Sequence, residues 1–312
     1  MARSEARYRE AERRLWDSVG VSPTERRIAL PRTGVTVRVQ EVGEGAPVVF
    51  VHGASNGGSS WAPLVARLPG YRCILLDRPG CGFSDRLATR FEDTSQLATF
   101  GEGLIVDVMD ALGLESANVV ATSFGGYIGL RTVAGHPERV SRLVLMGWPL
   151  GAPVAKLPAV MRLGMVPGLG SLIASVPPNA RAVRMMFRQI GLGQALDAGR
   201  ISQEALDWYL SLLRETPTMR NELTAGPRII HPLRGMNREI LLPESLLSSI
   251  TTPVGFLWGD GDPYGTTEIA RAFVGHFPNA ELRMMAGAGH AVWLDNPDVA
   301  AEFTRGFLGG SA

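Results

Sequence analysis

The sequence predicts an α/β fold, a doubly wound, mostly parallel sheet with an inserted all-helical cap. Short, continuously apolar runs recur along the chain and alternate with segments of helical periodicity. Strands that are apolar on both faces are typical of a parallel sheet covered by helices on both sides. One interval of about a hundred residues breaks this alternation with helical segments alone. We therefore expect one large domain, which 312 residues are long enough to form, carrying a helical insertion.

Residues 1–24 are predicted to form an N-terminal helical extension. Glu5 and Arg9 stand four positions apart in the order that stabilises a helix, and apolar side chains recur at helical spacing over residues 1–19. We expect this helix to pack on the body of the protein.

The core is expected to comprise residues 25–148 and 252–312. Two runs of alternating hydrophobicity within residues 26–40 predict a pair of strands ahead of the apolar runs. The buried strands are predicted at residues 48–51, 73–76, 118–121, 143–146, 254–258 and 282–285. The helices are predicted at residues 61–68, 96–112, 124–134, 268–276 and 297–307. Right-handed crossovers between parallel strands then place helices on both faces of the sheet.

The cap is expected to comprise residues 149–251, where the sequence shows no convincing strand. Helices are predicted at residues 179–190 and 202–213, and Ser202 is a suitable N-cap for the second. Because the insertion lies between two strands of one sheet, we expect it to cover the carboxyl edge, where open α/β sheets bind their ligands.

The charge balance argues against several classes of partner. With 31 basic and 30 acidic residues, the chain lacks the concentrated basic face of a nucleic-acid-binding protein. Cys73 and Cys81 make no disulfide framework. The N-terminus has no apolar segment typical of a secretory signal, and Pro and Gly break the longest uncharged stretch, so no membrane span is expected. We expect a cytoplasmic protein that acts on a small molecule, in an oligomeric state that the sequence leaves open.

Ser123 is the candidate nucleophile. It follows the apolar run 118–121, directly before a helical segment, in the sequence Thr-Ser-Phe-Gly-Gly. A Ser on a sharp strand-to-helix turn adopts a strained backbone conformation and needs small residues two positions before and after it, here Ala121 and Gly125. Such a turn presents the hydroxyl group at the N-terminus of the helix, beside its free N–H groups.

This pattern resembles the nucleophile motif Gly-x-Ser-x-Gly of the α/β-hydrolase family, with Ala121 in the place of the first Gly. The resemblance covers nearly the whole chain. In this family the catalytic base follows a late strand, which implies His290 in the sequence Ala-Gly-Ala-Gly-His. The acid usually precedes a Pro after the strand before it, which implies Asp262, with Asp260 as the alternative. The order Ser123, Asp262, His290 is that of the family.

The resemblance also implies two backbone donors for an oxyanion. Phe124 N–H follows the nucleophile, and Ala54 N–H lies in a loop similar to the family's His-Gly-x motif. His52 of that motif is expected to hold the loop. Residues 77–84 match a further family signature and are interpreted as a structural turn near the site, without a chemical role.

The activity implied by the resemblance is that of a serine hydrolase that cleaves a carboxylic ester through an acyl-enzyme, with no metal or organic cofactor. Carbon–carbon bond hydrolases often share the elbow Ser-Phe-Gly-Gly, but residues 54–56 depart from their usual His-Gly-x-Gly-Pro loop. Lactonases and cofactor-free haloperoxidases remain alternatives. A non-catalytic ligand-binding homologue is a further alternative, which the intact set of three residues disfavours.

A hydrophobic substrate is expected from the composition of the insertion. Methionines suit an adaptable apolar pocket, and we expect the substrate to be bound by Trp148, Met161, Met185 and Met186. Ordinary packing between helices is the alternative for each methionine. Residues 163–178, broken by Pro and Gly, are expected to form a mobile lip over the entrance.

Overall fold

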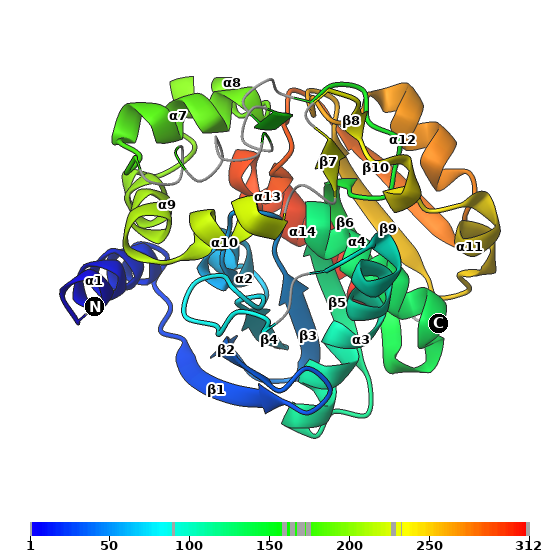
Figure 1. The fold of residues 1–312 in the computed structure, drawn as a ribbon, viewed down its shortest axis with the longest axis horizontal. Helices are drawn as coiled ribbons and strands as arrows, with labels where there is room; N and C mark the ends of the chain where they lie inside the picture. Colours follow the sequence, from blue (N-terminus) through cyan, green and yellow to red (C-terminus); the bar gives the residue numbers. More distant parts are fainter. Residues whose placement is uncertain are drawn as a thin grey trace.

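The computed structural model of the chain has the expected fold class. It describes residues 2–88, 91–157, 161–162, 166, 172, 176–225, 229–231 and 233–309. An eight-stranded sheet runs through the molecule in the order β1-β2-β4-β3-β5-β6-β9-β10, with helices on both of its faces (Figure 1). In the described part of the chain, no helix has the length and hydropathy that crossing a bilayer requires.

The strands of this sheet form an antiparallel edge and a longer parallel part. They are β1 (Thr24–Leu30), β2 (Val35–Val42), β3 (Ala46–Val51), β4 (Tyr71–Leu76), β5 (Ala117–Thr122), β6 (Val140–Pro149), β9 (Val254–Gly259) and β10 (Ala280–Met285). β2 pairs antiparallel with β1 and with β4, whereas all other neighbours are parallel. The alternating runs of the sequence thus form the antiparallel edge. The carboxyl ends of the parallel strands meet at one edge, which brings together the residues that follow them.

A hydrophobic core lies on each face of the sheet. Helices that contribute to the first core include α3 (Thr94–Leu112), α4 (Ser123–Gly135) and α12 (Thr267–Val274). Helices that contribute to the second include α2 (Ala62–Val65), α13 (Val292–Asp295) and α14 (Pro297–Gly309), together with helices of the insertion and of the N-terminus. Local signals set the ends of α3, because the Asp93 side chain accepts the N–H of Gln96 and Gly113 closes the helix at a φ of +67°.

The insertion between β6 and β9 is mostly helical. It contains α7 (Ala180–Gln189), α8 (Gly193–Asp197), α9 (Gln203–Glu215), α10 (Thr218–Ala225) and α11 (Glu244–Ser249). The Ser202 side chain caps α9, as predicted. The expectation of an all-helical insertion needs one correction, because β7 (Ile230–His231) and β8 (Gly235–Met236) form a two-stranded antiparallel sheet. Strands of two residues are too short to produce an alternating pattern in the sequence.

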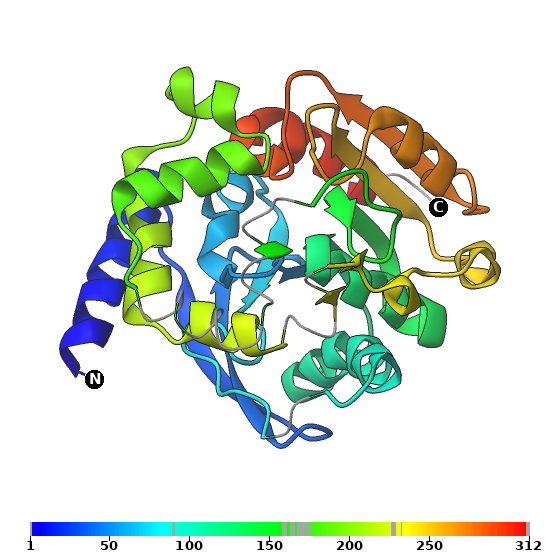
Figure 2. The same ribbon diagram turned by 45° about the horizontal axis from the view of Figure 1, so that its top comes forward.

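The N-terminal helix α1 (Ala2–Ser18) packs along α9 and joins the insertion to the core (Figure 2). On the side of the insertion, Trp208 Nε1 donates to Tyr8 Oη at 3.2 Å. On the side of the core, the Glu12 carboxylate accepts hydrogen bonds of 2.6 and 2.9 Å from Arg38 of β2, whose side chain is buried. The predicted helix is therefore present and contacts both parts of the molecule.

Candidate active site

Ser123 lies on the predicted strand-to-helix turn, because β5 ends at Thr122 and α4 begins at Ser123. Its φ of +53° is in the left-handed region that residues with a side chain rarely adopt. A Cβ at Gly125 would lie 2.2 Å from the carbonyl oxygen of Val51, so glycine is required two positions after Ser123. The predicted strain and the predicted need for a small residue are both confirmed.

A second strained residue lies in the loop after β3. Within the described residues, the non-glycine residues with a positive φ are Ser55, at +51°, and Ser123. Both line the same cavity. Backbone conformations of this kind cost about 1–3 kcal/mol each and cluster at functional sites. Their convergence marks this cavity as the candidate active site.

His290 and Asp262 form a buried, hydrogen-bonded pair. Nδ1 of His290 lies 2.8 Å from Oδ2 of Asp262. The backbone N–H groups of Trp148 and Tyr264 also donate to this carboxylate, at 2.9 and 3.0 Å. Three donors fix the orientation of the carboxylate. In the neutral imidazole, an Nδ1–H that donates to this carboxylate leaves Nε2 as an acceptor.

Asp260, the alternative acid, has a different partner. Its Oδ1 accepts the backbone N–H of Gly287 at 2.7 Å, and the residue is exposed. This hydrogen bond joins the loop after β9 to the loop after β10. Asp260 therefore shapes the two loops and does not contact the imidazole of His290.

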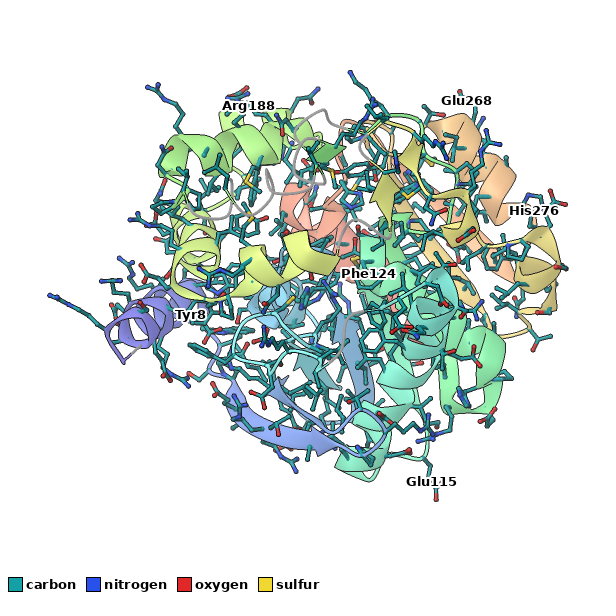
Figure 3. All side chains as sticks on the ribbon, viewed as in Figure 1. Tyr8, Glu115, Phe124, Arg188, Glu268 and His276 are labelled. Carbon is teal, nitrogen blue, oxygen red and sulfur yellow. The ribbon has the colours of Figure 1, made fainter. Side chains whose placement is uncertain are left out.

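A cavity of about 930 Å³ contains both Ser123 and His290. No hydrogen bond joins these two described side chains; such contacts often tighten only when substrate binds. Apolar side chains make up most of the wall, among them Leu87, Phe100, Leu150, Leu157, Phe187, Tyr209 and Trp293. Figure 3 shows Phe124, which also lines the cavity, below α10 in the middle of the molecule, whereas Arg188 and His276 lie at the periphery. Among the described residues, no group of His, Cys, Asp or Glu side chains could hold a metal ion.

Both implied oxyanion donors lie at this cavity. Phe124 is the second residue of α4, so its N–H is one of the free N–H groups in the first turn of the helix. Ala54 is exposed to the cavity in the segment of residues 52–58, which we call the oxyanion loop. The positive end of the α4 dipole lies at the same place. The arrangement can therefore supply N–H donors to negative charge that develops beside Ser123.

Arg78 lines the cavity, although the sequence indicates no chemical role for residues 77–84. Its Nε and Nη2 donate to the carbonyl oxygens of His52 and Gly53, at 3.0 and 2.9 Å. Nη2 also donates to the carboxylate of Glu222 on α10, at 2.7 Å. Arg78 thus fixes the position of the oxyanion loop and connects this loop to the insertion through its ion pair with Glu222. Its place directly after β4, at the carboxyl edge of the sheet, is the signal in the sequence that could have indicated such a role.

His52 is a buried residue that holds the oxyanion loop, as expected. Its Nε2 accepts the backbone N–H of Arg78 at 3.1 Å, and its Nδ1 lies 2.7 Å from the carbonyl oxygen of Gly53. Burial and the neighbouring Arg78 guanidinium hold the pKa of His52 well below its usual range. His52 is therefore neutral. The remaining three histidines do not line the cavity: His136, His231 and His276.

Three of the four residues expected to bind substrate line the cavity: Trp148, Met161 and Met186. Met185 does not, and its side chain is 54% exposed on the other side of α7. The side of α7 that faces the cavity carries Met186, Phe187 and Gln189, and Met185 lies outside this side of the helix. The prediction for Met185 is therefore wrong. The predicted lip over residues 163–178 lies mostly outside the described residues.

The chain resembles known proteins over most of its length. The profile of the family described as alpha/beta hydrolase fold matches residues 46–297. Among curated proteins, a 2-hydroxy-6-oxononadienedioate/2-hydroxy-6-oxononatrienedioate hydrolase of Paraburkholderia phymatum is 26% identical over 284 residues. That alignment covers 89% of this chain and 92% of the relative.

Solved structures with similar folds include two kinds of hydrolase. The 2-hydroxy-6-oxo-6-phenylhexa-2,4-dienoate hydrolase of a Rhodococcus species superposes with a TM-score of 0.74 at 20% identity, over 93% of this chain and 100% of that one. The carboxylesterase CesB of Bacillus subtilis superposes with a TM-score of 0.73 at 19% identity, over 99% of this chain and 100% of that one. At these identities, the structural similarity establishes the fold and leaves the substrate to be argued from the site.

Proposed function

Because the chain belongs to the α/β-hydrolase fold family, we propose that Ser123, His290 and Asp262 act as nucleophile, general base and orienting acid on a small molecule with a reactive carbonyl group. The observation that carries the proposal is the buried hydrogen bond of 2.8 Å between His290 and Asp262 in the same cavity as the strained Ser123. A nucleophile, a base and a group that orients the base are the parts that serine hydrolysis requires.

The proposed reaction proceeds through an acyl-enzyme. Ser123 Oγ attacks the carbonyl carbon while Nε2 of His290 takes its proton. The N–H groups of Phe124 and Ala54 stabilise the oxyanion that forms. His290 returns the proton to the leaving group, and a water molecule, activated by the same imidazole, releases the acid and regenerates Ser123. Neither a metal nor an organic cofactor takes part.

The substrate class that we propose first is a 2-hydroxy-6-oxodienoate, cleaved at the carbon–carbon bond beside its ketone. The curated relative described above is named for a substrate of this class. Such compounds carry a carboxylate, and Arg86 and Arg220 line the cavity without an ion pair to any other described residue. Their charge favours an anionic ligand. In this reaction the 2-hydroxydienoate first tautomerises, its hydroxyl proton moving to the carbon beside the ketone. Breaking the carbon–carbon bond then releases a dienolate, whose charge the conjugated system delocalises and whose oxygen takes the proton from His290.

A carboxylic ester is the second candidate substrate. It is favoured by the oxyanion loop, where Ala54-Ser55-Asn56 departs from the His-Gly-x-Gly-Pro pattern usual in carbon–carbon bond hydrolases. The similarity of the fold to a carboxylesterase supports the same alternative. The apolar wall of the cavity suits a hydrophobic acyl or alkyl group.

Two experiments test these proposals. Intact mass after treatment with a fluorophosphonate should show one adduct, which is absent in Ser123→Ala and retained in Ser248→Ala, whose serine is exposed on α11. Ser123→Ala should lower turnover by about 10⁴-fold or more. Full activity in Ser123→Ala would refute the mechanism.

The second experiment separates the two substrate classes. The protein is assayed in parallel with a chromogenic 2-hydroxy-6-oxodienoate and with p-nitrophenyl esters of increasing chain length. A kcat/KM for the dienoate at least about 100-fold above that for the best ester supports carbon–carbon cleavage. The opposite ratio supports the esterase.

A further inference from the structure

The loop that carries His290 is in contact with the insertion through its backbone. The N–H of His290 donates to the carbonyl oxygen of Ile190, at 2.8 Å, where α7 has just ended. We propose that Ile190, Gly191 and Arg200, which we call the base clamp, position the imidazole of His290 for proton transfer. The inference rests on the proposed function, since it concerns the base of that reaction.

Gly191 brings two further backbone segments into contact. Its φ is +87°, and a Cβ at this position would lie 2.5 Å from the carbonyl oxygen of Gly261 and 2.9 Å from Cα of Gly289. A Cβ at Gly289 would in turn lie 2.5 Å from the carbonyl carbon of Gly191. Gly261 directly precedes Asp262, and Gly289 directly precedes His290. The insertion thus packs, backbone against backbone, on the loops of both the acid and the base.

Arg200 acts on the same loop from the other side. Its Nε donates to the carbonyl oxygen of Asp295 at 3.0 Å, and its guanidinium lies 3.5 Å from the Asp295 carboxylate. That carboxylate is buried and accepts the N–H of Gly289 at 2.6 Å. The N–H of His290 therefore donates to the carbonyl oxygen of Ile190, in the insertion. The N–H of Gly289, one position earlier, donates to the Asp295 carboxylate, which pairs with Arg200 of the insertion.

These contacts explain how the position of the base depends on the insertion. Ser123 is fixed by the turn between β5 and α4, which lies within the core. The backbone of His290 is fixed in part by Ile190, which lies in the insertion. A shift of the insertion therefore moves the imidazole relative to Ser123. A displacement of about 1 Å at a reacting group can lower the rate about 100-fold.

The test compares Gly191 with Gly113, because each of these glycines follows a helix and has a positive φ. Gly191→Ala adds a Cβ that meets the loops of the acid and the base, whereas Gly113→Ala adds one that meets nothing within 4 Å, at a φ of +67°. Both variants carry the strain of a left-handed side chain. We expect fluorophosphonate labelling and kcat of Gly191→Ala to fall by about 30-fold or more, with KM changed less than about threefold. We expect both rates of Gly113→Ala to stay within about threefold of the wild type.

A spectroscopic measurement reports the base directly. The proton between His290 Nδ1 and Asp262 should give a far-downfield proton resonance, which Gly191→Ala should shift or broaden and Gly113→Ala should leave in place. Equal labelling rates in the two variants, or a loss confined to KM, would overturn the base clamp. If the wild type is not labelled at all, the proposed function fails, while the resonance still tests the clamp.

A second pair of variants covers the case in which Gly191→Ala does not fold. Arg200→Gln removes the charge that faces Asp295, and we expect about a tenfold loss of kcat with a nearly unchanged KM. Arg188→Gln removes an exposed arginine of α7 that pairs with Asp197, and we expect no loss. Equal kcat values in these two variants would contradict the role of Arg200.

Discussion

Two of the contacts between the insertion and the core beside the cavity are built from different groups. At the base clamp, Ile190 and Gly191 make the contact through backbone atoms, with glycines on both sides, and Arg200 adds a side-chain hydrogen bond. At the oxyanion loop it is made by side chains of α10. Glu222 accepts from Arg78 and from the thiol of Cys81, and the Asn221 side chain donates to the carbonyl oxygen of Gly80.

The two contacts should therefore tolerate substitution differently. A long side chain such as Glu222 can change its rotamer, and a water molecule can replace one lost hydrogen bond. Two backbones packed at van der Waals distance leave no such freedom, because any added carbon atom must displace one of them. We infer that the base side of the cavity is sensitive to volume and the oxyanion side to charge.

Among substitutions on the oxyanion side of the cavity, we expect Arg78→Met to have the largest effect on stability and on kcat. The variant leaves Glu222 without its cation, removes the guanidinium donor to the carbonyl group of His52 and leaves the carbonyl group of Gly53 with Nδ1 of His52 alone. Because Arg78 is buried, we expect a loss of about 3 kcal/mol in the free energy of unfolding and a fall in kcat on the order of 100-fold. Urea denaturation and steady-state kinetics measure both. A loss of stability below about 1 kcal/mol would show that the contact matters little.

A smaller effect is expected from Glu222→Gln, which keeps an oxygen acceptor for Arg78 and Cys81 while removing the charge. We expect a fall in kcat of about tenfold or less, clearly smaller than that of Gly191→Ala, although the latter adds one methyl group only. The kcat values of the two variants, measured on the same substrate, sharpen the comparison. The reverse order would contradict the distinction between a volume-sensitive and a charge-sensitive side.

The smallest expected effect is the change that Asp295→Asn makes in the pH dependence of the free energy of unfolding. Burial raises the pKa of Asp295 in the folded protein, with the Gly289 N–H and Arg200 opposing the shift. The stability that protonated Asp295 contributes is therefore present below the unfolded pKa of about 3.9 and is lost as the pH rises through the raised folded pKa.

Urea unfolding of the wild type and of Asp295→Asn between about pH 3 and pH 7 measures this difference. The free energy of unfolding of the wild type should fall relative to that of the variant as the pH increases. A difference that is constant with pH would show that the folded protein does not hold the proton on Asp295 more tightly than the unfolded chain does.

The sequence predicted those features of the fold and the candidate site that depend on local pattern. Runs that are apolar on both faces became the parallel strands, and the small residues around Ser123 became the strained turn. The resemblance to the α/β-hydrolase family implied the pairing of His290 with Asp262, and in the structure these residues follow the neighbouring strands β10 and β9.

Features that depend on contact between distant segments could not be predicted in this way. Gly191 and Gly289 look like ordinary turn glycines, and no pattern indicates that their backbones touch. The choice between Met185 and Met186 depends on a helix rotation of about 100°, which the placement of α7 on the core decides. Arg78 has a functional neighbour in Glu222, which lies 144 positions further along the chain.

The helix α1 has a consequence for the synthesis of the protein. Tyr8 leaves the ribosome 200 residues before its partner Trp208, a delay of about 10–40 s at about 5–20 residues/s. Arg38, which forms an ion pair with Glu12, is synthesised only 26 residues after Glu12. We therefore expect α1 to bind the first strands early, through the buried ion pair. Until α9 is synthesised, the apolar side of α1 that packs on α9 would be exposed on the nascent chain. A chaperone would bind this apolar surface during that time.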